Sequence, residues 1–189
     1  MSTELERGSN IRWRARLGVL VLLALAGTLL VSGGTAGVSA SGHEHLDAPD
    51  GFHPTLLAPP AGFVDDVALQ LRFRYDEPGA NQGATVARLS DAGNVVVARV
   101  TWDPEGTSGW HTHPGPVVVS IVEGELEVTN ASDCVARTYR AGEVWVDPGQ
   151  GNVHTAVNPS AENETVVVAT FFGVPPGQPA TEHVAPADC

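Results

Sequence analysis

Residues 106–124 read GTSGWHTHPGPVVVSIVEG, and the fold assignment depends mainly on this stretch. It places His111 and His113 two positions apart, shortly before a run of mostly β-branched residues that ends at Gly124. Side chains two positions apart on an extended strand point to the same face. The stretch therefore predicts two imidazoles side by side on one face of a sheet.

Short strand-like runs surround this stretch. Apolar and polar side chains alternate from Val67 to Tyr75, which indicates a strand with one face in a core. Further runs are rich in β-branched residues and bounded by Gly, Pro, Asn or Asp, which is typical of strands. These runs cover residues 95–102, 117–122, 126–129, 144–146, 153–157 and 165–172. The sequence therefore predicts an all-β, antiparallel sandwich or barrel over residues 66–173.

The segments on either side of residues 66–173 are rich in proline. Residues 41–65 contain four prolines and no sustained period, so we expect an irregular lead-in. Residues 174–189 are expected to form an extended, proline-rich tail. The two cysteines, Cys134 and Cys189, are expected to form one disulfide in an oxidising compartment and to fix this tail. Two unpaired surface thiols are the alternative.

The first 40 residues have the order of an export signal. Four arginines precede the apolar run 17–31, and small residues follow as far as Ala40. We expect cleavage after Ala40, with an uncleaved membrane anchor as the alternative. In both cases the domain lies outside the cytosol, either exported to the cell envelope or medium, or anchored with the domain outside. The membrane is a partner only through this segment.

Charge excludes one class of partner. The chain has no lysine and a net charge of −12, whereas contacts to phosphates need a basic face. We therefore expect no nucleic-acid binding. The length of 189 residues is sufficient for one domain with one core.

A second stretch, GEVWVDPGQGNVHTAVN at residues 142–158, contains His154 at the start of a predicted strand. Together with residues 106–124 it resembles the two motifs of the cupin superfamily. The first motif contains His-x-His, a glutamate and a glycine, and here Val117 occupies the glutamate position. The second motif contains Gly, Pro-x-Gly, His and Asn, and this chain has one extra residue between Pro148 and Gly151.

The resemblance implies a jelly-roll β-barrel that holds one divalent metal ion inside. His111, His113 and His154 carry over as ligands, with His154 coming from a strand across the barrel. Val117 cannot coordinate, so the alternatives are a neutral three-histidine centre or a barrel that has lost its metal. Neutral imidazole suits iron, copper, zinc and nickel, and manganese is a further candidate for the ion.

Three functions follow from this resemblance. The first is a metal-dependent, dioxygenase-like oxidoreductase acting on a small molecule, because related three-histidine cupins use that chemistry. The second is a non-catalytic module that binds a metal or a small ligand, and the third is a structural barrel without metal.

Several other residues have two interpretations. Three tryptophans either line an apolar pocket or pack in the core: Trp102, Trp110 and Trp145. Asn158 is expected to hold the end of its strand through hydrogen bonds to the backbone. His43, Glu44, His45 and His53 are interpreted as part of a solvated tail, with an accessory metal site as the alternative.

Overall fold

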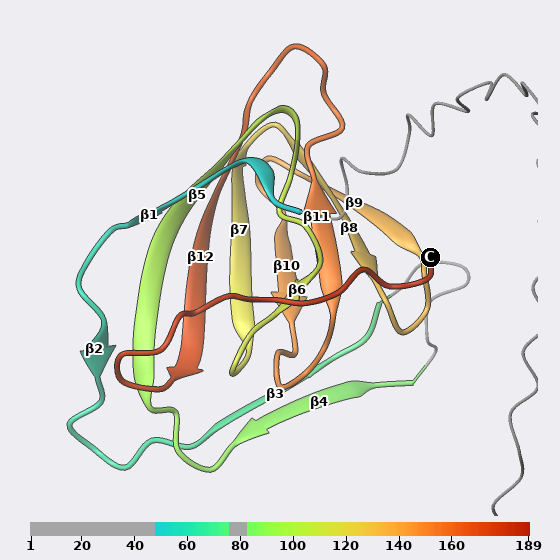
Figure 1. Cartoon of the computed structure of the whole chain (residues 1–189). Coiled ribbons are helices and arrows are strands. Elements are labelled where there is room, and N and C mark those ends of the chain that lie inside the picture. The colour runs from blue at the N-terminus through green and yellow to red at the C-terminus, as the bar shows by residue number, and fades with distance from the viewer. Residues whose placement is uncertain (1–47, 76–82) are drawn as a thin grey trace, which may run out of the picture. The chain divides into compact units, whose positions relative to one another are not determined.

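The computed structural model describes residues 48–75 and 83–189 (Figure 1). The predicted export segment 1–40 and the residues His43, Glu44 and His45 lie outside the described residues. Within the described ranges, no helix is both long enough and apolar enough to cross a membrane.

The described residues form an all-β, nearly closed antiparallel barrel (Figure 1). Its strand order is β10-β7-β12-β5-β11-β6-β13, with β8 paired to β11 and β9 to β8. At the edge, β1 and β2 pair with β5. The strands are β1 (Asp50–Leu56), β2 (Ala61–Gly62), β5 (Asn94–Thr107), β6 (His111–Thr112), β7 (Val117–Glu123), β8 (Glu125–Asn130), β9 (Ala136–Arg140), β10 (Val144–Asp147), β11 (His154–Val157), β12 (Thr165–Val174) and β13 (Glu182–His183).

The core lies between the inner faces of these strands. In β5 the side chains at alternate positions Val96, Ala98, Val100 and Trp102 are buried, as period-two patterning requires. They pack with buried side chains of β7 and β12, including Val119. Each apolar side chain of this size contributes roughly 1.5–3 kcal/mol when it is fully removed from water. The runs predicted from β-branched residues thus form the barrel wall.

The lead-in contains regular structure, so our expectation of an irregular segment over 41–65 was wrong for β1 and β2. Strand β1 pairs along β5, and Phe52 packs on Trp102 with ring centroids 5.2 Å apart. The register shifts between Asp50 and Phe52, where Gly51 has a φ of +57°. Only Gly51 and Phe52 of this strand are half-buried and its other residues are exposed, so β1 has no period-two pattern that the sequence could show.

The alternating residues 67–75 do form a strand, but outside the barrel. Strand β3 (Leu69–Phe73) pairs with β4 (Thr85–Leu89) in a separate two-stranded sheet. The inward side chains of β3 are only half-buried. The prediction of a strand is confirmed, and its assignment to the barrel wall is corrected.

The C-terminal segment runs beside β6. Strand β13 pairs with β6, and the N–H of Val184 donates to the carbonyl of Trp110. Cys134 and Cys189 are joined by a disulfide, as the sequence predicts. The tail therefore follows a defined course against the barrel, and it brings Ala180, Thr181 and His183 close to the predicted histidine site.

Candidate metal centre

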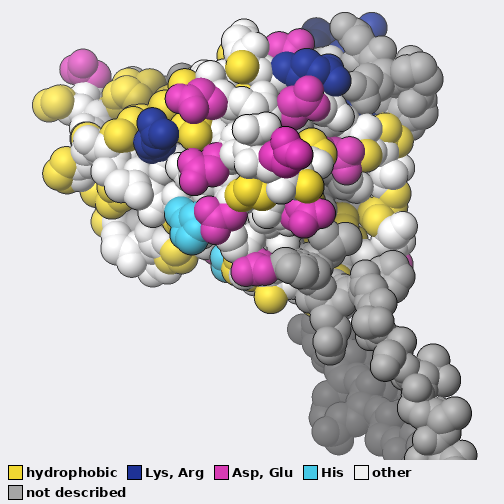
Figure 2. All heavy atoms as spheres, turned by 90° about the horizontal axis from the view of Figure 1, so that it is seen from above, with side chains coloured by type: hydrophobic (Ala, Val, Ile, Leu, Met, Phe, Trp, Pro, Cys, Tyr) yellow, Lys and Arg dark blue, Asp and Glu magenta, His cyan; other side chains and the backbone are white. Residues whose placement is uncertain are grey.

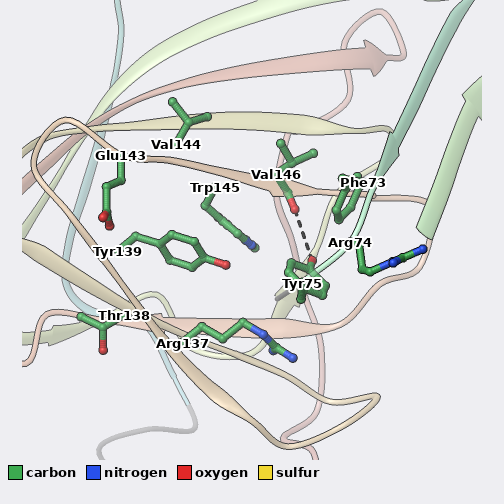
Figure 3. Close-up of a pocket in the computed structure, with 10 residues that line it drawn as sticks. All are labelled: Phe73, Arg74, Tyr75, Arg137, Thr138, Tyr139, Glu143, Val144, Trp145 and Val146. Atoms are coloured by element: carbon green, nitrogen blue, oxygen red, sulfur yellow. Dashed lines mark hydrogen bonds between the residues drawn. The ribbon is translucent and has the colours of Figure 1, made fainter. Parts of the chain in front are cut away.

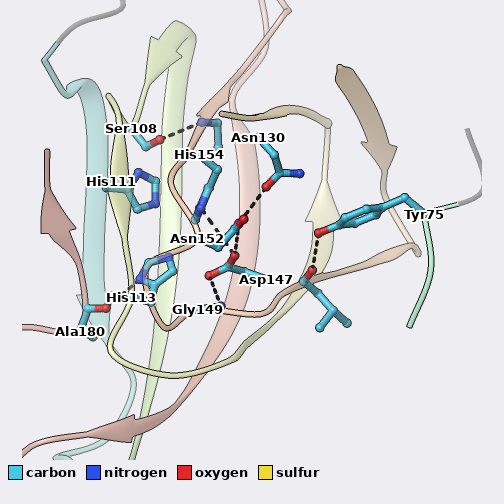
Figure 4. A network of polar contacts seen from close by, with 12 residues as sticks. Tyr75, Ser108, His111, His113, Asn130, Asp147, Gly149, Asn152, His154 and Ala180 are labelled. Atoms are coloured by element: carbon cyan, nitrogen blue, oxygen red, sulfur yellow. Dashed lines mark hydrogen bonds and ion pairs between the residues drawn. The ribbon is translucent and has the colours of Figure 1, made fainter. Parts of the chain in front are cut away.

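The structure brings the three predicted histidines together. His111 lies on β6 and His154 on β11, and the two residues are direct partners in the antiparallel pairing of these strands. His113 follows β6 directly and turns its ring to the same place (Figure 4). The expected position of His154 across the barrel was wrong, because β11 is the neighbouring strand.

The imidazoles form a compact, buried cluster. One nitrogen from each ring lies within 4.8 Å of the other two. The ring centroid of His111 lies 4.2 Å from that of His154 and 4.9 Å from that of His113. The three residues are at most 6% exposed. Such a group could hold a metal ion.

Hydrogen bonds fix which ring nitrogen of His111 and of His113 keeps a free lone pair. Nδ1–H of His111 donates to the carbonyl of Gly109 at 2.9 Å, and Nδ1–H of His113 donates to the carbonyl of Ala180 at 2.7 Å. A carbonyl only accepts, so each neutral ring carries its proton on Nδ1 and keeps a lone pair on Nε2. Within residues 48–75 and 83–189, neither nitrogen of His154 has a partner at full hydrogen-bond geometry, and the polar groups that act on this ring are the backbone of Asn152 and the carboxylate of Asp147. Buried lone pairs without a donor fit a cation.

Burial keeps these rings neutral. Loss of solvent lowers the pKa of His111 to about 3 and the pKa of His113 to about 4. The same effect, with the neighbouring imidazoles adding to it, holds the pKa of His154 well below its usual range. The neutral form is the one that binds metals, so the site is ready for a cation at neutral pH.

A fully buried carboxylate lies behind His154. Oδ1 of Asp147 is 3.7 Å from Nδ1 of His154. Asp147 accepts hydrogen bonds from Nδ2 of Asn152 at 2.8 Å and from the N–H of Gly149 at 3.0 Å (Figure 4). Burial raises the pKa of Asp147 to about 7, and these two hydrogen bonds oppose the rise.

Apolar side chains surround the cluster. A cavity of about 40 Å³ adjoins the three rings, and Val117 and Trp145 are among the residues that line it. Trp145 contacts His154 edge to face, with ring centroids 4.9 Å apart, and Phe171 contacts His113 at 5.2 Å. Val117 is 1% exposed and offers no ligand atom. The cavity has room for water-sized groups beside the rings.

A larger hollow of about 400 Å³ also touches Trp145 (Figure 3). It is lined by Tyr75, Tyr139 and Arg137, and the guanidinium of Arg137 lies 4.4 Å from the centroid of the Tyr75 ring. Asp133 neutralises the Arg137 charge at 2.6 Å. Trp145 therefore lines both this hollow and the histidine cavity.

The structure also shows where the tryptophans, the asparagine and the exposed histidine singled out in the sequence lie. Trp102 lines the histidine cavity as well as the core, whereas Trp110 is buried without lining it. Asn158 holds its strand end as predicted, because Nδ2 donates to the carbonyls of Asp103 and Asn163. His53 is exposed, bonds Asp103 and lies outside the cluster.

Sequence analysis missed Asp147 and Ala180. Asp147 lies two residues after the inward-facing Trp145, so strand periodicity could have indicated its inward direction. Ala180 contributes its backbone carbonyl, and a pattern of side chains cannot predict where a backbone carbonyl will lie.

Comparisons with known proteins gave one match to a family model and several to solved structures. A family model described as a cupin domain matches residues 98–171. No curated protein matches the sequence. A structure of oxalate oxidase matches with 32% identity over 41% of each chain, at a TM-score of 0.37. A cupin-like protein from Thermotoga maritima matches with 21% identity over 62% of this chain and 76% of its own, at a TM-score of 0.43.

The polyketide cyclase RemF from Streptomyces resistomycificus matches with 16% identity over 50% of this chain and 63% of its own, at a TM-score of 0.41. The matched part of the oxalate oxidase structure is less than half of its length. The family match covers the three histidines, strands β6–β11 and most of β5 and β12, and we conclude that residues 98–171 of this chain are a cupin domain.

Proposed function

We propose that the domain binds one divalent metal ion through Nε2 of His111, His113 and His154. One observation carries this proposal, namely three buried, neutral rings whose ligand nitrogens converge within 4.8 Å. The Nδ1 hydrogen bonds of His111 and His113 support it, because they direct the lone pairs toward a common point.

Surface charge also supports a cationic ligand. The chain carries a net charge of −12, and acidic side chains outnumber basic ones on the face seen in Figure 2. A negative surface raises the local concentration of cations and speeds their association. Because imidazole is neutral, the bound ion would keep its full positive charge and attract anionic small molecules to its open positions.

Two functions compete for such a site. We place the binding of a metal with water-sized ligands first, because the cavity beside the rings measures only about 40 Å³. A dioxygenase-like oxidoreductase acting on a small molecule is the second candidate. Three protein ligands leave coordination positions open, which is typical of catalytic centres. A bound ion would supply Lewis-acid or redox chemistry there.

We further propose that the domain works outside the cytosol. The Cys134–Cys189 disulfide supports this location, because such bonds persist in oxidising compartments. The apolar run at 17–31 after an arginine cluster supports it from the sequence.

Metal binding is tested by dialysing the purified, oxidised chain separately against iron under anaerobic conditions, copper, zinc, nickel and manganese. Elemental analysis is expected to find one ion per chain for at least one of these metals. Failure to retain any of the five above buffer level would overturn the proposal and leave the structural barrel.

Turnover is tested on the metal-loaded chain by oxygen uptake with small carboxylates, thiols and diketones. The matched control is the His154→Ala variant treated with the same metal. Uptake that depends on His154 would move the oxidoreductase to first place. Stoichiometric metal without uptake would support the binding module.

A further inference from the structure

We propose that Asp147 is a positioning residue that holds His154 in its Nδ1–H form and supplies, from behind this ring, the negative charge that is missing at position 117. The inference rests on the proposed metal site and assigns it a fourth functional side chain.

Strand pairing places the carboxylate of Asp147 next to position 117, where the cupin motif has a glutamate and this chain has a valine. Asp147 on β10 is the direct antiparallel partner of Val117 on β7. Directly opposite residues in such a pair project to the same face of the sheet. Both side chains are buried, at 0% and 1% exposure. This inner face therefore carries a carboxylate on β10, next to the position on β7 where the cupin motif has its glutamate.

The contacts of Asp147 leave an acceptor facing His154. Oδ2 accepts from the backbone N–H of Gly149 at 3.0 Å. Oδ1 accepts from Nδ2 of Asn152 at 2.8 Å and lies 3.7 Å from Nδ1 of His154 (Figure 4). Nδ2 of Asn152 also donates to Oδ1 of Asn130 at 2.9 Å, which anchors the group from β8. The aspartate is therefore held on two sides with Oδ1 toward the ring.

An acceptor at Nδ1 determines what the other ring nitrogen can do. At 3.7 Å the carboxylate acts on His154 through its charge, and this negative charge favours the form with the proton on Nδ1 and the lone pair on Nε2. The carbonyls of Gly109 and Ala180 select the same form in the other two histidines through hydrogen bonds. A carboxylate behind a ligand histidine also raises the basicity of the ligand nitrogen. Asp147 would thereby balance part of the charge of an ion held by three neutral rings.

The Asp147→Asn variant reverses this polarity with almost no change in shape. The N–H of Gly149 is a fixed donor, so the amide oxygen must take its place there. The amide NH₂ then takes the place of Oδ1 and offers a donor to Nδ1 of His154, a nitrogen that held a proton. The Asn152 amide, which donated to Oδ1, must turn to present its oxygen. We expect His154 to shift toward the Nε2–H form, which has no lone pair for a metal.

Long-range ¹H–¹⁵N spectra of the metal-free chain read out the tautomer of each histidine. In the wild type we expect His154 as Nδ1–H. In Asp147→Asn we expect a shift toward Nε2–H, while His111 and His113 stay Nδ1–H as internal controls. An Nε2–H form of His154 in the wild type overturns the inference without any variant, as does an unchanged tautomer in a variant whose near-UV circular dichroism is native.

Zinc titration provides a second readout. We expect Asp147→Asn to weaken zinc binding about 10- to 100-fold. The double variant Val117→Glu with Asp147→Asn moves the negative charge from β10 to its partner strand β7. This variant is expected to bind zinc more tightly than Asp147→Asn alone. Wild-type zinc binding with no loss in Asp147→Asn overturns the inference and leaves the proposed function. A wild type that binds no metal but shows the tautomer shift overturns the proposed function and leaves the positioning role.

Discussion

His154 lies directly opposite His111 in the pairing of β11 with β6, and their ring centroids are 4.2 Å apart. Two of the three candidate ligands are thus a cross-strand pair, whose spacing is set by the hydrogen bonding of the sheet. The third, His113, is oriented by a carbonyl 67 residues away in sequence. The cluster therefore depends on the barrel and on the C-terminal segment together.

Replacing any of the three histidines by Ala is expected to abolish stoichiometric metal binding, because two remaining nitrogens hold a divalent ion weakly. Elemental analysis after dialysis provides the measurement. His53→Ala is the matched control, since this exposed residue lies outside the cluster. Full retention of metal in the His154→Ala variant would remove this residue from the ligand set.

Val117→Glu is expected to have opposite effects with and without metal. Without metal, it buries a second acidic group directly opposite Asp147, so the melting temperature should fall. With metal, the carboxylate becomes a fourth ligand, so the metal-induced rise in melting temperature should exceed that of the wild type. Val117→Gln is the control of similar size. An equal metal-induced rise in Val117→Glu and the wild type would mean that the side chain at 117 does not reach the ion.

Acid is expected to destabilise the metal-free domain. The folded-state pKa values of His111 and His113 are lowered, so their contribution is complete above pH 6.5 and is lost as the pH falls toward 4. Each histidine lowers the free energy of unfolding by about 1.4 kcal/mol per pH unit in this range. The raised pKa of Asp147 acts in the opposite direction between its ordinary value of 3.8 and about 7, so it offsets part of this loss of stability.

The measurement is urea unfolding of the metal-free wild type and His113→Gln between pH 6 and pH 4.5. The slope of unfolding free energy against pH should be smaller in the variant by about 1.4 kcal/mol per unit. Equal slopes would show that His113 takes up a proton in the folded state as readily as in the unfolded chain.

Reduction of the Cys134–Cys189 bond is expected to lower the free energy of unfolding. The bond closes a loop with a sequence separation of 55, and this loop is released when the bond is reduced. The chain-entropy model gives about 4 kcal/mol for a loop of this length. The check compares thermal unfolding of the wild type and of the Cys134→Ser, Cys189→Ser double variant. Identical melting temperatures would contradict the stabilising role.

Gly149 is expected to tolerate a side chain less well than its neighbour Gly151. Both have a positive φ, at +60° and +89°, so alanine costs roughly 1–2 kcal/mol at each position through backbone strain. A Cβ at 149 would also overlap the carbonyl of Gly115, whereas a Cβ at 151 meets no atom of the described residues within 4 Å. Urea unfolding should therefore show a larger loss for Gly149→Ala, and equal losses would contradict the close approach.

The sequence was sufficient for the parts of the site that depend on side-chain pattern. The spacing of His111 and His113 and the second motif around His154 located the cluster, and β-branched runs located most of the wall. Pairing between strands could not be read from local patterns, so the strand of His154 was predicted correctly but was expected across the barrel, whereas it pairs directly with the strand of His111. Strand β1 was missed because most of its side chains are exposed and its burial does not alternate.

The carbonyl of Ala180 that orients His113 lies nine residues beyond the end of the segment matched by the cupin family model, which stops at residue 171. The part of the chain that can be excised or fused to another protein is therefore longer than the family domain. A fragment ending at 171 would keep the three histidines of the cluster. It would lose the carbonyl that accepts from His113, the pairing of β13 with β6 and the Cys134–Cys189 bond. Engineered boundaries for this barrel should include residues 172–189.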